Sequence, residues 1–314
     1  MEYRTLGNTD LRISAITLGA WQYGKQFWSG IEDDESLSAI RAALDAGINA
    51  IDTAVGYGGG HSEEIVGRAV AGRRDEVILL SKCWSDPAQI PSQIDACLAR
   101  MGIECIDVYQ VHYPSPSIPV CDTIGAMAEI QRAGKIRHIG VSNFDLKQME
   151  EAAATARIEV CQPPYNVFWR EIDDGVLPFC IEHNIAVLPY SPLAQGLLAG
   201  RFRRREDVPD DIRANSKLLA PEVLDVALPI VDRLAAMAET RGKTVAQAAI
   251  AWTLNVPGIT SAIVGARTAG QARENVGGVG WKLTDAEQAE VADLGLTVHR
   301  MLDYSSNIWG WKPS

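Results

Sequence analysis

The chain has 314 residues, of which 47% are hydrophobic and 22% are charged, and its formal net charge is −11 at pH 7. These proportions are ordinary for a globular protein, and the negative charge argues against general nucleic-acid binding. No apolar run approaches the roughly 20 residues that span a bilayer, and the first residues lack the apolar core of a signal peptide. We therefore expect a cytoplasmic protein that binds neither nucleic acid nor a membrane.

Strand-like and helix-like segments alternate along almost the whole chain after a short start, residues 3–14, that predicts a hairpin. The predicted strands are residues 15–21, 48–54, 77–83, 106–112, 136–142, 158–162, 185–190 and 261–264. The predicted helices are residues 33–46, 62–71, 91–101, 120–133, 145–155, 173–183, 222–241, 244–254, 269–276 and 285–294. Asp33 and Ser62 fit the N-cap positions of the first two helices. An irregular charged stretch, residues 201–217, interrupts the rhythm.

Eight strands, each followed by a helix, predict a (β/α)8 TIM barrel with an N-terminal β-hairpin and extra helices, in one domain over residues 1–314. The alternative is a doubly wound open sheet, which needs a G-x-G-x-x-G motif after its first strand. Neither residues 18–24 nor the glycine-rich residues 56–60 have that spacing. The six cysteines include no C-x-x-C pair, which predicts reduced thiols and no bound metal.

Three consecutive predicted strands each end in a side chain that can do chemistry. Asp52, Lys82 and His112 lie at these strand ends, and Tyr57 follows Asp52 in a glycine-rich loop. An all-parallel barrel places its active site at the carboxyl ends of its strands. We therefore expect these four residues to meet at one mouth of the barrel.

Together the four residues suit proton transfer to or from a carbonyl oxygen. Tyrosine has an ordinary pKa of about 10, and a lysine ammonium beside it favours the tyrosinate and lowers that pKa. Asp52 would pair with Lys82 and hold it charged, while His112 would orient the substrate oxygen. The set lacks an evident nucleophile, which argues against covalent catalysis. Each residue alone also has a structural interpretation, but their coincidence at consecutive strand ends favours catalysis.

Residues 52–67 carry the most specific motif of the chain. With residues 3–7, 134–144 and 271–275, this motif resembles the aldo-keto reductase superfamily, in its bacterial branch similar to potassium-channel β-subunits. The resemblance covers nearly the whole chain. It implies a (β/α)8 barrel that binds NADP(H) without a Rossmann domain. It also implies that Tyr57 is the general acid/base, tuned by its neighbours.

The same resemblance implies cofactor contacts. Ser142 and Asn143 are expected to hold the nicotinamide carboxamide beside Gln162, and Tyr190 to stack on the nicotinamide ring. Residues 191–201 resemble the loop along the pyrophosphate. The complete set of expected cofactor contacts is Trp21, Asp52, Ser142, Asn143, Gln162, Tyr190, Ser191, Leu193, Gly196, Arg201, Arg213, Gly265, Arg267, Gln271, Glu274 and Asn275.

The adenosine site is expected within residues 265–275, where Arg267 could bind the ribose 2′-phosphate or stack on adenine. Many relatives have Lys or Ser in this segment where this chain has Gly265 and Ala266. NADP(H) is the expected cofactor, with NAD(H) as the alternative.

The expected substrate is a small carbonyl or alcohol compound, such as an aldehyde, ketone, sugar or polyol. Its expected contacts are Trp21, Tyr57, Trp84 and His112. Further aromatic residues predicted near strand ends are Trp28, Phe144, Phe168 and Trp169, and a tail with Trp309 and Trp311 could fold over the mouth. The alternative function is a redox-sensing regulatory subunit with little turnover, like the channel β-subunits. By the resemblance those subunits carry Asn where this chain has His112, which favours the enzyme.

Overall fold

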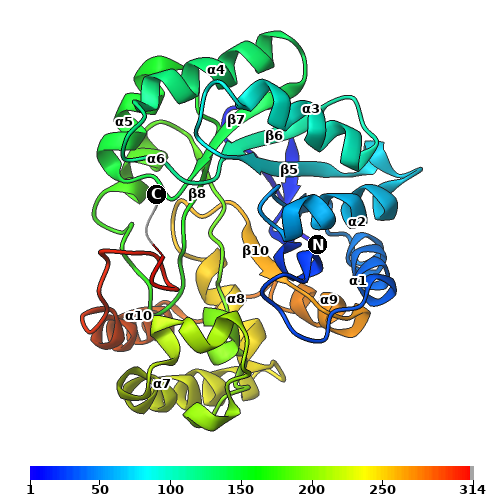
Figure 1. Ribbon diagram of the computed structural model, residues 1–314. Helices are drawn as coiled ribbons and strands as arrows, with labels where there is room; N and C mark the ends of the chain where they lie inside the picture. The colour runs from blue at the N-terminus through cyan, green and yellow to red at the C-terminus, as the bar shows by residue number, and fades with distance from the viewer. Residues whose placement is uncertain (312–314) are drawn as a thin grey trace.

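The computed structural model describes residues 1–311. Parallel strands form its central sheet in the order β10-β3-β4-β5-β6-β7-β8-β9 (Figure 1). Their bounds are β3 (Ile16–Gly19), β4 (Ala50–Asp52), β5 (Ile78–Cys83), β6 (Ile106–Val111), β7 (Ile136–Ser142), β8 (Val160–Gln162), β9 (Ala186–Val187) and β10 (Ala262–Gly265). The sheet curls into a barrel, so the predicted fold class is confirmed.

The barrel closes between β9 and β10 through isolated contacts instead of a continuous ladder. An isolated parallel bridge joins Tyr190 to Ile263, and the Ile263 amide donates to the Pro189 carbonyl at 2.9 Å. The sequence predicted residues 185–190 as one strand, but Pro189 has no N–H to donate. Pro163 ends β8 in the same way. Pro189 thus explains why β9 is shorter than predicted, whereas β8 ends at Gln162 as predicted and begins two residues later.

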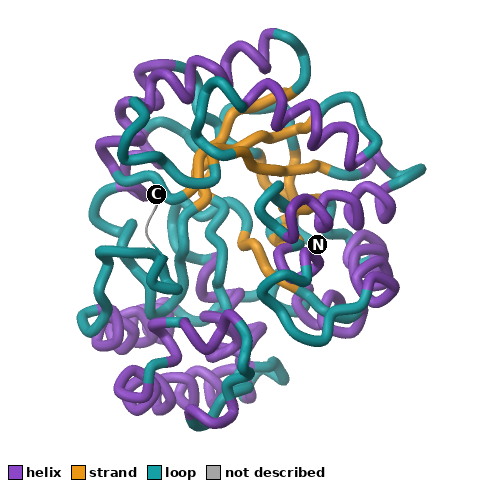
Figure 2. The backbone as a smooth tube through the Cα atoms, in the orientation of Figure 1, coloured by secondary structure: helices purple, strands orange, loops and turns teal. Residues whose placement is uncertain are grey.

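Helices surround the strands on the outside of the barrel (Figure 2). Their bounds are α1 (Asp33–Asp45), α2 (His61–Val70), α3 (Ile90–Met101), α4 (Val120–Arg132), α5 (Leu146–Thr155), α6 (Val176–Glu182), α7 (Pro221–Glu239), α8 (Val245–Leu254), α9 (Ala269–Val276) and α10 (Asp285–His299). Helix α10 is longer than the sequence predicted, and α6 is shorter. Within residues 1–311, no helix combines the length and apolar character that a bilayer crossing needs.

Two predicted N-caps are wrong because tertiary contacts claim the side chains. Asp33 is the first residue of α1, and its carboxylate binds Lys25 Nζ at 2.8 Å and His61 Nε2 at 2.9 Å. Ser62 lies inside the first turn of α2, where its hydroxyl donates to the Ala20 carbonyl at 2.7 Å. The Ser62 hydrogen bond joins α2 to the residue that follows β3, at the carboxyl end of the barrel.

An N-terminal hairpin seals the amino-terminal end of the barrel. Strand β1 (Tyr3–Thr5) pairs antiparallel with β2 (Arg12–Ser14), which confirms the predicted hairpin. Leu6, Leu11 and Ile13 from the hairpin are buried. They pack with the inward side chains of the barrel, namely Ala50, Ile78, Leu80, Val108, Val160, Ala186, Leu188 and Ile263.

The barrel interior changes from apolar to polar along each strand. Residues two apart on a strand share a face, so the next inward residue lies one layer nearer the carboxyl end. The successive inward pairs are Ala50 and Asp52 on β4, Leu80 and Lys82 on β5, Val108 and Gln110 on β6, and Val160 and Gln162 on β8. A buried polar layer therefore lies directly above the apolar layer.

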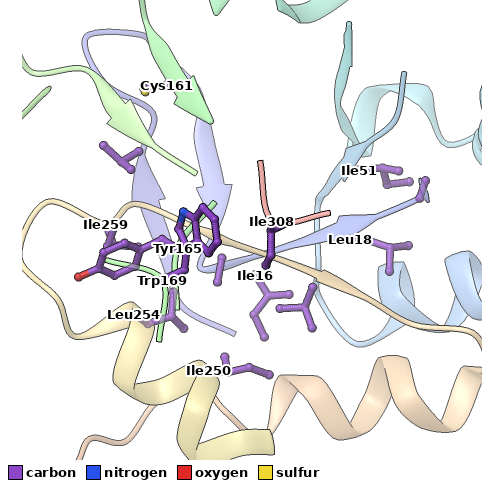
Figure 3. Close-up of a cluster of buried hydrophobic side chains, with 14 of the residues drawn as sticks. Ile16, Leu18, Ile51, Cys161, Tyr165, Trp169, Ile250, Leu254, Ile259 and Ile308 are labelled. Atoms are coloured by element: carbon purple, nitrogen blue, oxygen red, sulfur yellow. The ribbon is translucent and has the colours of Figure 1, made fainter. Parts of the chain in front are cut away.

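A second core fills the space between the strands and the helices (Figure 3). It includes Ile308, from the C-terminal tail, in the same cluster as Tyr165 and Trp169. Ile308 is fully buried, and its carbonyl accepts from the Lys217 amide at 2.9 Å. Burying such a side chain contributes about 1.5–3 kcal/mol. This anchor holds the tail against the carboxyl end of the barrel.

Candidate active site and cofactor cleft

The polar layer brings the four predicted catalytic residues together at the carboxyl ends of the strands. Asp52 is the last residue of β4, and Lys82 is the last inward residue of β5. His112 follows β6, where its amide donates to the Cys83 carbonyl at 2.8 Å. Tyr57 enters from the loop after β4, just before a 3₁₀ turn of three glycines.

Lys82 is fully buried, and all three of its donors have partners. Its Nζ lies 2.5 Å from Asp52 Oδ1, 2.9 Å from the Thr53 carbonyl and 3.2 Å from the Tyr57 hydroxyl. Burial lowers the pKa of Lys82, while the Asp52 carboxylate opposes that shift. The contacts with Asp52 and Thr53 thus orient the Lys82 ammonium toward the phenol oxygen of Tyr57.

Asp52 is held by a buried amide network on its other oxygen. Gln162 Nε2 donates to Asp52 Oδ2 at 2.8 Å, and Gln110 Nε2 donates at 3.2 Å. The two amides also bond to each other at 3.2 Å. Sequence analysis missed Gln110. The signal was available, because Gln110 is a polar residue inside an apolar strand and shares its inward face with His112.

The surroundings of the Tyr57 phenol favour its neutral form. Burial raises the pKa of Tyr57 well above its usual value, and the charges of Asp52 and Tyr113 raise it further. The sequence predicted a lowered pKa for Tyr57, and this prediction is wrong, because burial dominates and raises the pKa. Lys82 Nζ still lies 5.0 Å from the centre of the Tyr57 ring, where it would stabilise a phenolate as the charge forms.

His112 is a neutral imidazole in a fixed position. Burial lowers its pKa well below 6.5, and the charge of Lys82 lowers it further. Trp84 stacks on the ring with centroids 5.3 Å apart, and the Tyr57 ring meets its edge at 5.7 Å. His112 Nδ1 is buried without a hydrogen-bond partner among residues 1–311. Aromatic walls, and not an acidic partner, therefore orient this imidazole.

The remaining predicted site residues line one cleft of about 850 Å³ with Tyr57 and His112. Ligand sites commonly have volumes of about 300–1,000 Å³. Every expected cofactor contact and every expected substrate contact borders this cleft, namely Trp21, Asp52, Tyr57, Trp84, His112, Ser142, Asn143, Gln162, Tyr190, Ser191, Leu193, Gly196, Arg201, Arg213, Gly265, Arg267, Gln271, Glu274 and Asn275. Lys82 alone of the predicted residues does not, because it lies behind the phenol.

Asn143 is fixed by a set of hydrogen bonds at the end of β7. Its Nδ2 donates to the His112 carbonyl at 2.9 Å, and its Oδ1 accepts from the Tyr190 hydroxyl at 2.8 Å. Its backbone has φ of 62°, in the left-handed region that Asn tolerates better than most residues. The Ser142 hydroxyl donates to the Gln162 carbonyl at 2.7 Å. This arrangement leaves amide and hydroxyl groups at the cleft wall.

The loop after Tyr190 brings its backbone close to the cleft. Gln195 and Gly196 both have positive φ, at 60° and 106°. A Cβ at Gly196 would lie 3.1 Å from the Phe202 ring, so a side chain would crowd this turn. Exposed backbone N–H groups in such turns form concave sites for anions.

Three arginines, Arg201, Arg213 and Arg267, line the cleft and form what we call the arginine cluster. Burial lowers the pKa of Arg267, and the charges of Arg213 and Arg201 lower it further, whereas the Asp211 carboxylate opposes the shift. Arg267 Nη2 donates to the Ser29 carbonyl, while its buried Nε has no partner among residues 1–311.

The structure also corrects the expected aromatic surroundings. Phe144, Phe168 and Trp169 are buried in the core and do not border the cleft. Sequence analysis missed Tyr113, Asn307 and Phe27, which do. Two further aromatic residues of the cleft, Trp309 and Trp311, come from the tail, as expected for a tail that covers the mouth.

The tail contacts both walls of the cleft. The Trp309 ring lies 4.7 Å from that of Trp21 and stacks at 6.1 Å on Tyr190. Asn307 Nδ2 donates to the Tyr113 hydroxyl at 3.2 Å. Nothing in the local sequence predicts these contacts, because the tail is distant from its partners along the chain.

Residues 15–295 match the Aldo/keto reductase family, so the chain belongs to that family. Aldo-keto reductase YhdN of Bacillus subtilis is 39% identical, over 93% of this chain and 92% of that protein. NADH-specific methylglyoxal reductase of Escherichia coli is 31% identical, over 94% and 98%. A probable voltage-gated potassium channel subunit beta of Arabidopsis thaliana is 32% identical, over 88% and 90%.

Solved structures agree with this assignment. The glycerol dehydrogenase AKR11B4 from Gluconobacter oxydans superimposes with a TM-score of 0.88 and 35% identity, covering 97% of this chain and 98% of that one. An aldo/keto reductase from Klebsiella pneumoniae, in complex with NADP and acetate, gives 0.77 and 30%, covering 94% and 95%. Both likenesses extend over the barrel and the cleft, since they cover almost the whole chain.

Proposed function

We propose that this protein is an NAD(P)(H)-dependent oxidoreductase that interconverts a carbonyl compound and its alcohol, with Tyr57 as the general acid and base. The observation that carries the proposal is the 3.2 Å contact between the Tyr57 hydroxyl and Lys82 Nζ, with Lys82 held by Asp52 at 2.5 Å. A phenol so placed can release a proton at neutral pH only if a cation stabilises the resulting charge.

The residues of the cleft fit a nicotinamide dinucleotide. Ser142, Asn143 and Gln162 offer amide and hydroxyl groups for a carboxamide, and Tyr190 offers an aromatic face. The arginine cluster, including the unpartnered Arg267 Nε, offers donors for phosphate groups. A family member from Klebsiella pneumoniae binds NADP, and an Escherichia coli relative is NADH-specific, so both cofactors merit testing.

A nicotinamide cofactor held in this cleft would supply the hydride for reduction and accept it in oxidation. In the reduction, the Tyr57 O–H proton passes to the carbonyl oxygen as the carbon gains its hydride, and the phenolate left behind faces the Lys82 ammonium. In the oxidation, the phenolate takes the proton of the alcohol. Because the free phenol is protonated at neutral pH, the resting site is ready for reduction, whereas oxidation requires that the proton first be removed.

His112 positions the substrate oxygen. A neutral imidazole carries one N–H, which donates to a carbonyl oxygen without a change of net charge. Stacking of Trp84 on the ring restricts its rotation. The oxygen would then accept from His112 and Tyr57 together, which fixes the carbonyl carbon for hydride transfer.

Aromatic side chains surround this oxygen position. Trp21 lies 6.1 Å from the Tyr57 ring, and Trp309 lies 4.7 Å from Trp21, both as centroid distances. Such faces suit the apolar faces of sugars and polyols as well as aryl groups. We therefore propose small aldehydes, ketones, sugars or polyols as the substrate class.

The proposal is tested by steady-state turnover of the wild-type protein and the Tyr57→Phe variant. NADPH and NADH oxidation would be followed with a panel of aldehydes and ketones, and the reverse reaction with polyols. We expect turnover by the wild type and a loss in kcat of at least about 10² for Tyr57→Phe, with cofactor affinity retained.

Tyr113→Phe is the matched control, because it removes a phenol hydroxyl from the same cleft that bonds to Asn307 and not to Lys82. Its kcat should stay within a few-fold of the wild type. Near-normal turnover by Tyr57→Phe would eliminate the proposed mechanism. Cofactor binding without turnover of any compound would favour the alternative of a redox-sensing subunit.

A further inference from the structure

The carboxylate of Asp211 forms an ion pair with one residue of the arginine cluster. Asp211 accepts from Arg213 Nε at 2.8 Å and from Arg213 Nη2 at 2.5 Å, and the side chains are 3% and 7% exposed. Arg213 borders the cleft, and Asp211 does not. Asp211 thus engages Nε and Nη2 of an arginine that borders the cleft.

Asp211 is ionised and changes the charge of the cluster. Burial by itself would raise the pKa of Asp211, but hydrogen bonds from the Arg213 side chain and backbone outweigh burial and lower that pKa. Arg201 and Arg267 make no ion pair within residues 1–311. The Asp211 carboxylate therefore offsets one of the three positive charges of the cluster.

We propose that Asp211 sets the preference of this protein between NADP(H) and NAD(H), acting through Arg213 as a positioning residue and counter-charge. The inference rests on the proposed function, because it concerns the cofactor of that same cleft. NADP(H) differs from NAD(H) by a 2′-phosphate, and a phosphate monoester carries close to two negative charges near neutral pH. We place the 2′-phosphate beside Arg213, and the Asp211 carboxylate then weakens NADP(H) more than NAD(H), since only NADP(H) bears that group.

The geometry separates this role from a purely structural one. Asp211 also caps the 3₁₀ turn Ile212–Asn215 by accepting from the Arg213 amide at 3.1 Å, and it accepts from the Ser29 hydroxyl at 3.4 Å. Asn at this position keeps a carbonyl oxygen for the capping bond and removes the charge. The Ile212 amide still donates to the Phe27 carbonyl at 3.1 Å, which joins the two loops independently.

The test is isothermal titration of the wild type and Asp211→Asn with NADPH and with NADH, at low and at high salt. We expect Asp211→Asn to bind NADPH about three- to tenfold more tightly at low salt, as the removal of one nearby charge predicts. Affinity for NADH should change by less than about twofold. The gain for NADPH should largely persist at about 0.5 M salt, because Asp211 and Arg213 are buried and ions screen buried charges only weakly.

Two variants control for other effects. Asp207→Asn removes a carboxylate from the same segment, but Asp207 pairs with Arg204, and neither residue borders the cleft. This variant should leave the NADPH to NADH ratio unchanged. In the Arg213→Gln background, Asp211→Asn should still favour NADPH, because the carboxylate then repels the phosphate without its arginine partner.

The outcomes are distinguishable. An unchanged or lowered NADPH to NADH affinity ratio in Asp211→Asn, or a gain that 0.5 M salt abolishes, would overturn this inference and leave the proposed function intact. A wild-type protein that binds neither nucleotide would overturn both. Restoration of the wild-type ratio in Asp211→Glu, which returns the charge, would further support the role of Asp211.

Discussion

The catalytic group and the arginine cluster border the same cleft, but they are built in different ways. Lys82, Asp52 and Gln162 project from strands into a buried layer, where they form hydrogen bonds with one another and with the backbone. Arg201, Arg213 and Arg267 come from loops and short turns, and the Arg267 Nε lacks a partner among residues 1–311. Strands provide the fixed geometry that proton transfer needs, whereas loops provide hydrogen-bond donors that a ligand can engage.

The contrast also concerns electrostatics. In the catalytic group, burial dominates the pKa of Tyr57, Lys82 and His112 in each case. In the arginine cluster, like charges add to the effect of burial on Arg267. A substitution in the first region should therefore disturb both folding and chemistry, whereas one in the second should change affinity.

Lys82→Met is expected to have the largest effect, because it removes the partner of a buried carboxylate. We expect kcat to fall by about 10² or more, and the free energy of unfolding by about 3 kcal/mol. Urea denaturation and steady-state kinetics would measure the two effects. Lys135→Met, which breaks the surface pair with Asp95, should cost less than about 1 kcal/mol. If Lys82→Met and Lys135→Met lost equal unfolding free energy, the buried pair of the catalytic region would stabilise the fold no more than a surface pair does.

The pH dependence of the oxidation tests the catalytic region alone. Oxidation needs the Tyr57 phenolate, whose fraction rises about tenfold per pH unit below the raised pKa of the phenol. We expect kcat for alcohol oxidation to rise from pH 6 to pH 9, with no break near 6.5, because His112 stays neutral over this range. Stopped assays at constant ionic strength would record the profile. A flat profile, or a transition near pH 6.5, would assign the proton to another group.

Arg267→Ala should have a smaller and purely binding effect. Removal of this arginine should weaken NADPH about tenfold and NADH much less, as titration calorimetry would show. Arg273→Ala, on the exposed face of α9 and outside the cleft, is the control and should change neither. Equal losses for the two nucleotides would instead indicate that Arg267 stacks on adenine.

Much of the catalytic region could be predicted because strand periodicity is local. Ile78, Leu80 and Lys82 alternate along β5, so one strand pattern indicates both the core below and the ammonium above. The same reasoning applies to Gln110, although sequence analysis passed it over. That residues 1–314 form a single domain, and that the protein is cytoplasmic, remain predictions.

The tail and the ion pair behind the arginine cluster could not be predicted. Ile308 and Asn307 meet residues that are distant along the chain, and no periodicity in the tail indicates those partners. The Asp211 to Arg213 contact spans two residues, a spacing common to many charged loops. Burial of both side chains, which gives the pair its importance, depends on the folded loops around it. Pro189 lies within a predicted strand. Its missing N–H indicates an early strand end, but the strand pattern was given more weight.

The hairpin at the opposite end has a consequence for the timing of the reaction. Leu6, Leu11 and Ile13 fill the amino-terminal end of the barrel, so a compound reaches Tyr57 only from the side of the tail. Substrate entry and product departure therefore share one opening, bordered by Trp309 and Trp84. The side chains that select a substrate also set how long its product stays, and a tighter fit at this opening would slow the return of the free enzyme.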